Sequence, residues 1–545
     1  MSLTRRRFLG RAAPLGVLTL FPACAESDAN PSALPASLST EPFAHGVASG
    51  DPLADAIILW TRVTVPGAAM VPGAAMVSGA ATAPVSVEWR VARDSKLTDV
   101  VARGRVETSA DVDFTVKLDV ASLEAATTYY YDFAALGARS RVGRTRTLPR
   151  GATARARIAV VCCANYPAGF FNAYRLVAER ADLDLVLHLG DYLYEYGNGT
   201  LGDGTAIDRV PKPDRETVSL DEYRQRHAQY KLDPDLQEAH RQHPFIAIWD
   251  DHEVANNAYR DGAANHQPDS EGDWALRKAA AMRAYFEWMP IRERAPGDTE
   301  RVYRSFSYGD LFDLLLLDTR YDRDARLAGN CDPKSLADPA RSVLGAEQEQ
   351  WLLSALSESQ GRGARWRLLG QQVMFAQLSD VAKGCVEQPD QWDGYPFARD
   401  RLLSAVRAGI DDVVILSGDA HSSWAFDIAP DPFDPEQYTA ATGAGSLAVE
   451  FVAPAVTSPG PGGDVQPLID THPHLKFADL TRRGYVLLDL DEQRAQAEWY
   501  FLLSVAEPLA REQLGAVYQV ARGQAHLTAG AMASQPRTDA ADPAP

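Results

Sequence analysis

The chain contains 545 residues, of which 46% are hydrophobic and 23% are charged, as in an ordinary soluble globular protein. A chain of this length is longer than a single hydrophobic core usually supports, so we expect two domains. The formal net charge of −19 argues against non-specific binding of nucleic acid, which needs a basic surface, and five cysteines are too few for a disulfide-rich scaffold.

Residues 1–30 are predicted to form a twin-arginine export signal. Thr4-Arg5-Arg6-Arg7-Phe8-Leu9 has the twin-arginine form, and an apolar stretch too short for a good membrane span follows it. A chance cluster of arginines is the alternative, and Cys24 is either a lipid-anchor cysteine or is lost with the signal. No other segment is predicted to cross a membrane. We expect the twin-arginine machinery as a partner and a periplasmic or extracellular protein.

Two regions of different periodicity follow the signal. From 42 to 147, short strands such as Val85–Val91 and Phe114–Val120 alternate with period two, which predicts a small immunoglobulin-like or fibronectin-like β-sandwich. From 155 to 505, apolar strands alternate with helical stretches, which predicts one large α/β domain. The tail at 526–545 is rich in Ala, Asp and Pro and is predicted to be disordered.

Three apolar strands are each predicted to end at a carboxylate, with a histidine or tyrosine close behind. The three stretches are Leu189-Gly190-Asp191-Tyr192-Leu193-Tyr194, Trp249-Asp250-Asp251-His252-Glu253 and Ser417-Gly418-Asp419-Ala420-His421. In open α/β sheets, chemistry gathers beyond the carboxyl ends of the strands. Oxygen and imidazole ligands that converge there indicate a metal site with more than one ion.

Each candidate also has an ordinary structural explanation. Asp191 is either a carboxylate that bridges two ions or a helix N-cap, and Tyr194 is either a ligand or a packing residue. The run 250–253 is either part of the site or a solvated turn. His421 is either a ligand or a buried, hydrogen-bonded histidine, and Cys163 is either a thiolate ligand or a small core residue.

Together these segments resemble the PhoD-like alkaline phosphatases, exported metallophosphoesterases of the calcineurin-like superfamily. The resemblance runs from about 43 to about 505 and rests on five stretches. They are Phe43-Ala44-His45-Gly46-Val47-Ala48-Ser49-Gly50-Asp51-Pro52, Cys163-Ala164-Asn165-Tyr166, Gly190-Asp191-Tyr192-Leu193-Tyr194-Glu195-Tyr196, Trp249-Asp250-Asp251-His252-Glu253 and Gly418-Asp419-Ala420-His421-Ser422. The resemblance implies a metallophosphoesterase double-sheet sandwich flanked by helices, which follows the small all-β domain.

The resemblance also implies a division of labour among the candidates. The ligands that it implies for a ferric ion are Cys163, Asp191, Tyr194 and His421. Asp191 would bridge to a second ion, expected to be calcium, that Asp251 and Asp419 complete. His252 would lie beside the substrate phosphate, where it would stabilise charge or protonate the leaving group. Cys162 departs from the small polar residue that the family pattern suggests there, and the flanking motif favours Cys163 as the ligand.

The expected function is hydrolysis of phosphate mono- and diesters by in-line attack of a water or oxide that the metal ions activate. A phospholipase D-like diesterase is the alternative with the same chemistry. A non-enzymatic surface-binding protein and a zinc hydrolase are further alternatives, and the second is disfavoured because the ligand set is rich in oxygen. We expect a monomer. Whether Cys331 and Cys385, both in polar loop sequence, pair with each other stays open.

Overall fold

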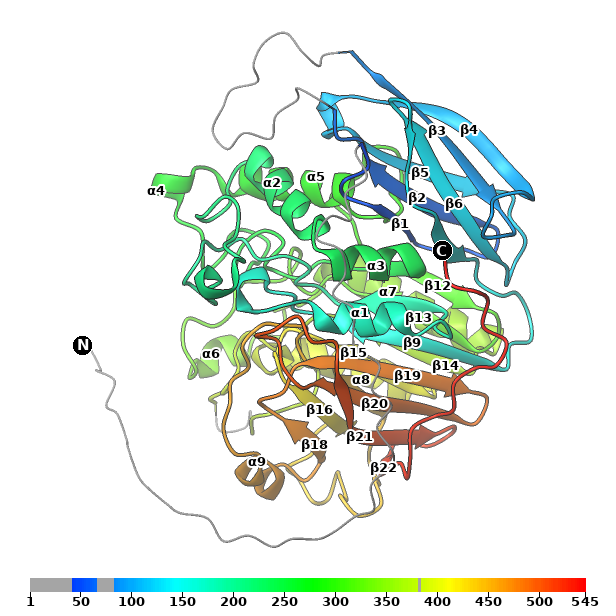
Figure 1. Ribbon diagram of the computed structural model, residues 1–545. Helices are drawn as coiled ribbons and strands as arrows, with labels where there is room; N and C mark the ends of the chain where they lie inside the picture. The colour runs from blue at the N-terminus through cyan, green and yellow to red at the C-terminus, as the bar shows by residue number, and fades with distance from the viewer. Residues whose placement is uncertain (1–41, 66–82, 381–383) are drawn as a thin grey trace, which may run out of the picture. The chain divides into compact units, whose positions relative to one another are not determined.

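The computed structural model describes residues 42–65, 83–380 and 384–545 (Figure 1). These described residues belong to one compact unit. Among the described residues, no helix is long and apolar enough to cross a membrane. The predicted export signal and Cys24 lie outside the described residues.

A ten-stranded sheet forms the first of two facing layers. Its strands, in spatial order, are β22 (Leu527–Ala529), β21 (Glu512–Ala521), β20 (Arg494–Leu502), β19 (Gly484–Asp491), β9 (Arg155–Val161), β10 (Leu185–His188), β11 (Pro244–Ala247), β1 (Val47–Gly50), β2 (Ala56–Arg62) and β5 (Thr115–Ala121). Strands β9, β10 and β11 are parallel, and every residue of β10 and β11 is buried. Parallel strands are typically covered on both faces, which explains their unbroken apolar sequence.

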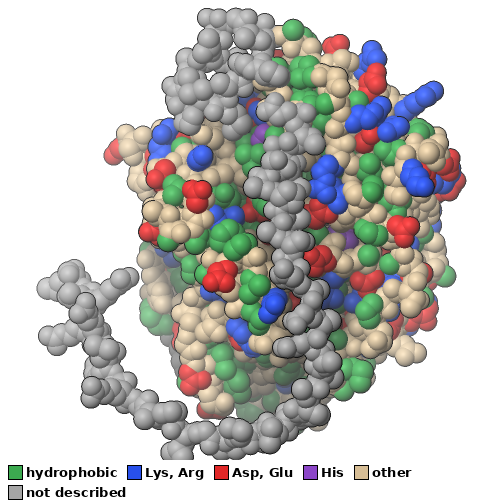
Figure 2. Space-filling model, viewed as in Figure 1, with side chains coloured by type: hydrophobic (Ala, Val, Ile, Leu, Met, Phe, Trp, Pro, Cys, Tyr) green, Lys and Arg blue, Asp and Glu red, His purple; other side chains and the backbone are tan. Residues whose placement is uncertain are grey.

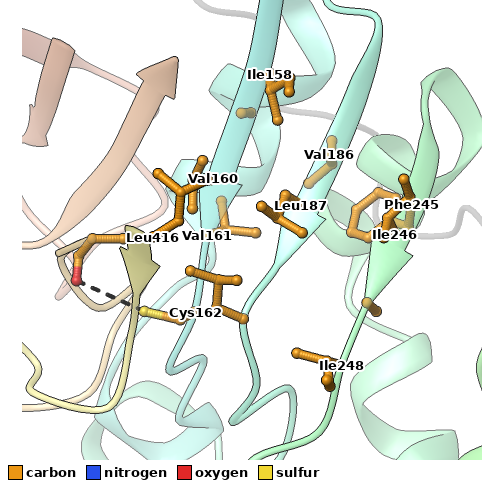
Figure 3. Close-up of a cluster of buried hydrophobic side chains, with 14 of the residues drawn as sticks. Ile158, Val160, Val161, Cys162, Val186, Leu187, Phe245, Ile246, Ile248 and Leu416 are labelled. Atoms are coloured by element: carbon orange, nitrogen blue, oxygen red, sulfur yellow. Dashed lines mark hydrogen bonds between the residues drawn. The ribbon is translucent and has the colours of Figure 1, made fainter. Parts of the chain in front are cut away.

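A seven-stranded sheet forms the second layer. Its strands, in spatial order, are β12 (Arg304–Tyr308), β13 (Phe312–Leu316), β14 (Trp366–Gly370), β15 (Val413–Ser417), β17 (Ala448–Val452), β16 (Ser423–Ile428) and β18 (Leu475–Asp479). One core joins the two sheets, since Leu187 of β10 and Leu416 of β15 belong to the same buried cluster (Figure 3). The predicted double-sheet sandwich is therefore confirmed.

Helices cover the outer faces of both sheets. The α-helices of the described residues are α1 (Asn172–Glu179), α2 (Leu220–Lys231), α3 (Pro234–Gln242), α4 (Pro268–Glu271), α5 (Trp274–Trp288), α6 (Pro333–Leu336), α7 (Gly345–Arg362), α8 (Pro396–Arg407) and α9 (Gln466–Thr471). Val177 of α1 and Leu236 of α3 share the core of the first sheet. Leu352 of α7 and Leu403 of α8 share a second core with Ile415 of β15. These contacts hold the parallel strands, and therefore their ends, in fixed positions.

The N-terminal β region is a sandwich, as the sequence predicts, but it is not self-contained. Its outer sheet consists of β4 (Val100–Thr108), β3 (Val85–Ala92), β6 (Thr128–Ala135), β7 (Ala138–Arg139) and β8 (Gly143–Arg146). Tyr131 of this sheet packs in one cluster with Ile57 of β2. Strand β1 pairs in parallel with β11, with Gly50 opposite Phe245, so the inner sheet of the sandwich continues the ten-stranded sheet. This pairing covers an edge of the parallel strands that would otherwise be exposed.

The prediction of a disordered tail at 526–545 does not hold. Strand β22 joins the edge of the ten-stranded sheet, and Ala544 is only 5% exposed. The hydroxyl of Tyr130 donates to the backbone oxygen of Asp542 at 2.6 Å, and Figure 1 shows the chain end beside β6. Polar composition predicts disorder only when the chain offers no partners for the tail, and here buried side chains supply them.

Acidic and basic side chains are interspersed on the face shown in Figure 2. The acidic side chains that give the net charge of −19 are therefore not concentrated in one area of this face. Net charge of this size favours solubility and says little about the fold.

Candidate metal centre

The candidate site lies where strands of the two sheets end. Cys163 follows β9 by two residues, Asp191 follows β10 by three, and Asp419 follows β15 by two. The two sheets touch here, because a Cβ added at Gly418 would lie 3.4 Å from the backbone oxygen of Leu189. The site therefore draws on strand ends from both layers, at the place where open α/β sheets usually carry their chemistry.

Four of the predicted site residues have a left-handed backbone. Their φ angles are 59° for Cys163, 55° for Asp191, 57° for Asp419 and 52° for His421. Residues other than glycine rarely adopt this conformation, and it costs on the order of 1 kcal/mol or more at each position. The strand ends thus turn sharply to direct these side chains to one place, and such strain is concentrated at functional sites.

A first cluster joins β9, β10 and β15. One ligand atom each of Cys163, Asp191 and His421 lies within 4.8 Å of the others. The hydroxyl of Tyr194 donates to Asp191 Oδ2 at 2.7 Å and lies 2.9 Å from His421 Nε2. The Ser458 hydroxyl donates to the Tyr194 oxygen at 2.6 Å, which fixes the phenol. The structure therefore brings together all four residues that the resemblance implies for iron.

A second cluster adjoins the first and shares Asp191 with it. Carboxylate oxygens of Asp250, Asp251 and Asp419 lie within 4.8 Å of one another, and so do ligand atoms of Asp191, Asp251 and His252. Three buried carboxylate atoms here have no hydrogen-bond partner, namely Asp191 Oδ1, Asp250 Oδ2 and Asp251 Oδ1. Buried carboxylates are nearly always paired, so these free oxygens fit cations bound at this place.

Burial and neighbouring charges shift the pKa values of Asp191 and Asp251 in opposite directions. Burial raises the pKa of Asp191, but the positive charges of His252 and His421 outweigh burial and lower it to about 2. Burial raises the pKa of Asp251 to about 6, against the opposing charge of Arg320. Asp191 is therefore ionised throughout the neutral range, whereas Asp251 becomes fully available to a cation only above about pH 6.

The thiol and the imidazole of the first cluster hold protons that a metal must displace. Burial raises the pKa of Cys163 well above its ordinary value, and Cys162 and Asp191 raise it further. Burial lowers the pKa of His421, but Cys163 and Asp191 outweigh it and raise the pKa to about 10. Metal binding at this cluster should therefore release protons.

His252 is held by a carboxylate and by two aromatic rings. Its Nδ1 lies 2.6 Å from Glu195 Oε2, and the ring centroids of Tyr194 and Tyr196 lie 4.2 and 5.2 Å from its own. Burial lowers the pKa of His252, but the charges of Glu195 and Asp191 outweigh it and raise the pKa well above its ordinary value. The imidazole is therefore protonated at neutral pH, as an acid or a charge stabiliser must be.

Sequence reasoning missed the role of Glu253. Its carboxylate accepts the backbone N–H of Asp250 at 2.7 Å and that of Asp191 at 3.2 Å, so it links the ends of β10 and β11. Its place beside His252 in the predicted run is the signal that was available. Gly190 allows this close approach, because a Cβ there would lie 2.5 Å from the Cβ of Asp250.

Three further residues of the site had no predicted role, and they are Arg320, Asp390 and Gln391. The Arg320 guanidinium is fully buried and donates to Asp390 at 2.6 Å and to Asp419 at 2.5 Å. Arg320 follows β13 by four residues, so it too lies just beyond a strand end. Asp390 and Gln391 lie in a loop without a recognisable motif.

Cys162 and Cys163 point to different surroundings. Cys162 pairs with Ala455 in an isolated β-bridge and lies among core residues such as Val161 and Leu416 (Figure 3). Its Sγ is 3.6 Å from the backbone oxygen of Pro454. Only Cys163 joins the cluster with Asp191 and His421. This placement agrees with the alternation of side chains at a strand end.

Two solved structures are similar to this chain in fold, and one further relative is similar to it in sequence. A purple acid phosphatase from yellow lupin, PPD1, matches 88% of this chain and 74% of its own, with a TM-score of 0.52 and 14% identity, which shows a common fold. A structure described as PhoD matches with a TM-score of 0.81 and 34% identity over 92% of this chain and 94% of that chain. Alkaline phosphatase D of Bacillus subtilis (strain 168) is 35% identical over an alignment of 525 residues, which covers 92% of this chain and 85% of the relative. The fold and the site define a metallophosphoesterase that hydrolyses phosphoric esters.

The match to family models is more specific. The model described as PhoD-like phosphatase matches residues 158–499, and the model of the N-terminal domain of these phosphatases matches residues 27–149. The chain therefore belongs to the PhoD-like phosphatase family.

Proposed function

We propose that the site binds a ferric ion beside calcium and hydrolyses phosphate mono- and diesters. The observation that carries this proposal is the position of Asp191, which contributes to both clusters of potential ligands. A carboxylate at such a position can bridge two ions. The ligands proposed for iron are Cys163, Asp191, Tyr194 and His421, and those proposed for calcium are Asp191, Asp251 and Asp419.

The donor chemistry supports a different metal at each cluster. A thiolate and a phenolate, from Cys163 and Tyr194, are strongly basic anions that stabilise a trivalent ion. The oxygens of Asp251 and Asp419 are the hard ligands that calcium prefers. Neither cluster offers the mainly nitrogen and sulfur environment of a structural zinc site.

The residues of the chain have separate tasks in the proposed reaction. When bound, the ions supply positive charge for the phosphate oxygens and activate the attacking water. Asp191 keeps the two clusters together, with one oxygen bonded to Tyr194. His252 stands beside Asp191 and Asp251, and Glu195 fixes its ring. We infer that His252 stabilises charge on the leaving oxygen or protonates it.

A substrate panel tests the proposal against the phospholipase D-like alternative. We expect p-nitrophenyl phosphate and bis-p-nitrophenyl phosphate both to be hydrolysed, and both activities to be lost in Asp191→Asn, which keeps the size of the side chain. Hydrolysis restricted to choline phospholipids would favour the alternative. Activity of Asp191→Asn on both esters at the wild-type rate would contradict the proposed site.

We further propose that the protein is exported by the twin-arginine route as a monomer and works in the periplasm or outside the cell. The motif at residues 4–9 supports this route. A disulfide between Cys331 and Cys385 supports an oxidising compartment. Replacement of Arg5, Arg6 and Arg7 by lysine should leave active enzyme in the cytoplasm, and continued export of that variant would contradict the route.

A further inference from the structure

The carboxylate of Asp419 is held on both oxygens. Arg320 donates to Oδ1 at 2.5 Å, and the side-chain amide of Gln391 donates to Oδ2 at 2.6 Å. Asp419 is one of the more open site residues, with its side chain 18% exposed, whereas Arg320 is fully buried and Gln391 is 6% exposed. A partly exposed carboxylate is therefore fixed by two buried donors.

Arg320 is itself fixed by carboxylates. Its guanidinium donates to Asp390 Oδ2 at 2.6 Å and also contacts Asp250. The other oxygen of Asp390 accepts from Arg323 at 2.8 Å, and Arg323 also binds the backbone oxygen of Asp390 at 3.0 Å. Asp390 and Gln391 are neighbours, so one short stretch of chain supports both donors of Asp419.

This stretch follows a disulfide. Cys385 is bonded to Cys331, 54 residues earlier, and Asp390 follows Cys385 by five residues. The backbone N–H of Val386 donates to the backbone oxygen of Asn330 at 2.7 Å. A small apolar cluster of Leu327, Leu336 and Val386 lies beside the bond.

We propose that the loop 384–391, anchored at Cys385 by the disulfide, is a positioning element of the second cation site. Gln391 and Arg320 are its positioning residues, and they keep Asp419 directed at the ion that it shares with Asp251. This inference rests on the proposed calcium site. Residues that orient metal ligands typically change metal affinity by about 10–100-fold when they are removed.

A purely structural disulfide would behave differently. Such a bond stabilises the whole fold by restricting the conformations of the unfolded chain, and it leaves the calcium affinity of the site unchanged. A positioning role instead lowers calcium affinity, and excess calcium then restores activity. The proposed iron ligands are in a different cluster from Asp419, so the visible absorption of the iron-loaded protein should not change.

The experiment is calcium titration by calorimetry of the iron-loaded protein after removal of calcium. We compare the wild type with Gln391→Ala and with the double variant Cys331→Ser/Cys385→Ser. The control is Gln237→Ala on α3. Gln237 is also a buried glutamine, but its side-chain amide donates to the backbone oxygens of Ala44 and Lys231, which are not site residues. Reducing agents are avoided because they would also reduce the ferric ion.

We expect the calcium Kd to rise by about tenfold or more in both test variants and to stay unchanged in the control. Activity at saturating calcium should return toward that of the wild type. A wild-type Kd in Gln391→Ala overturns the inference, even if the double variant does not fold. If the wild-type protein binds no calcium, the proposed calcium site itself is wrong. Failure of the positioning role and failure of the calcium site therefore give different results.

Discussion

Asp191 combines several local features that rarely occur together. Its backbone is left-handed, one carboxylate oxygen accepts from Tyr194, and the other is buried without a partner. The left-handed backbone and the unpaired buried oxygen each cost free energy in the metal-free chain. A cation bound at the free oxygen would offset that cost, which is why we place Asp191 at the centre of the site.

His252 should prove separable from the metal ligands. In His252→Ala we expect kcat to fall by about 10²–10⁴-fold, because general acid catalysis is lost, while iron and calcium contents stay near those of the wild type. The loss should be smaller for an ester with a leaving group of low pKa, such as p-nitrophenol, than for an alkyl phosphate, and this comparison is an internal control. Loss of bound metal in the variant would instead make His252 a ligand.

The sequence predicts residues at strand ends far better than their supporting partners. Cys163, Asp191 and His421 each follow an apolar strand, and parallel strands bring such ends together. Two supporting residues contact the site from distant segments of the chain. Glu195 bonds to His252, 57 residues away in the sequence, and Gln391 bonds to Asp419, 28 residues away. No local pattern records such contacts, so these two roles required the structure.

At the scale of elements, the ends of β10 and β11 must approach closely. Gly190 has a φ of 102°, and a Cβ there would lie 2.5 Å from the Asp250 Cβ and 2.7 Å from its backbone nitrogen. Glu253 then links the two strand ends through backbone N–H groups. The geometry of the second cluster therefore depends on the absence of one methyl group.

We expect Gly190→Ala to lower the free energy of unfolding by about 1–3 kcal/mol and to reduce calcium affinity, because the two strand ends are forced apart. The matched control is Gly199→Ala, since Gly199 also has a positive φ of 85° but has no atom within 4 Å of the added Cβ. For each variant, thermal unfolding measures the stability and calcium titration measures the calcium affinity. Equal effects on calcium affinity in the two variants would show that strain, not contact between the strands, is responsible.

Element prediction succeeds where periodicity is strong. The expected strands Val85–Val91 and Phe114–Val120 agree with β3 and β5 to within one residue at each end. The parallel pairing of β1 with β11 joins segments almost 200 residues apart. Pairing over such distances depends on the whole fold, which is why a separate N-terminal sandwich was expected and a shared sheet was found.

At the scale of the whole molecule, the metal-free protein carries more buried negative charge than it can pair. Burial raises the pKa of Asp251 from 3.8 to about 6 and that of Glu253 from 4.5 to about 8. A carboxyl whose pKa is higher in the folded than in the unfolded state binds more protons when folded. Stability therefore falls as pH rises between the two values.

We expect the chelated protein to lose stability from pH 4 to pH 8, with about 3 kcal/mol from Asp251 alone, since each pKa unit corresponds to about 1.4 kcal/mol. Calcium should reduce this loss, because it replaces the protons on the second cluster. Thermal unfolding at several pH values, with and without calcium, measures both effects. Stability of the chelated protein that rises over this range would contradict the charge balance described here.

The central claim is that two chemically different ions share Asp191, and metal analysis with visible spectroscopy tests it most directly. Phenolate and thiolate ligands of Fe(III) absorb visible light, so the purified wild type should contain iron and calcium and be coloured. Asp191→Ala should lose both metals and the colour, Tyr194→Phe should change the colour, and Asp419→Ala should lose calcium alone. A colourless, fully active wild type that contains only zinc, or an Asp191→Ala variant that keeps both metals, would contradict the account.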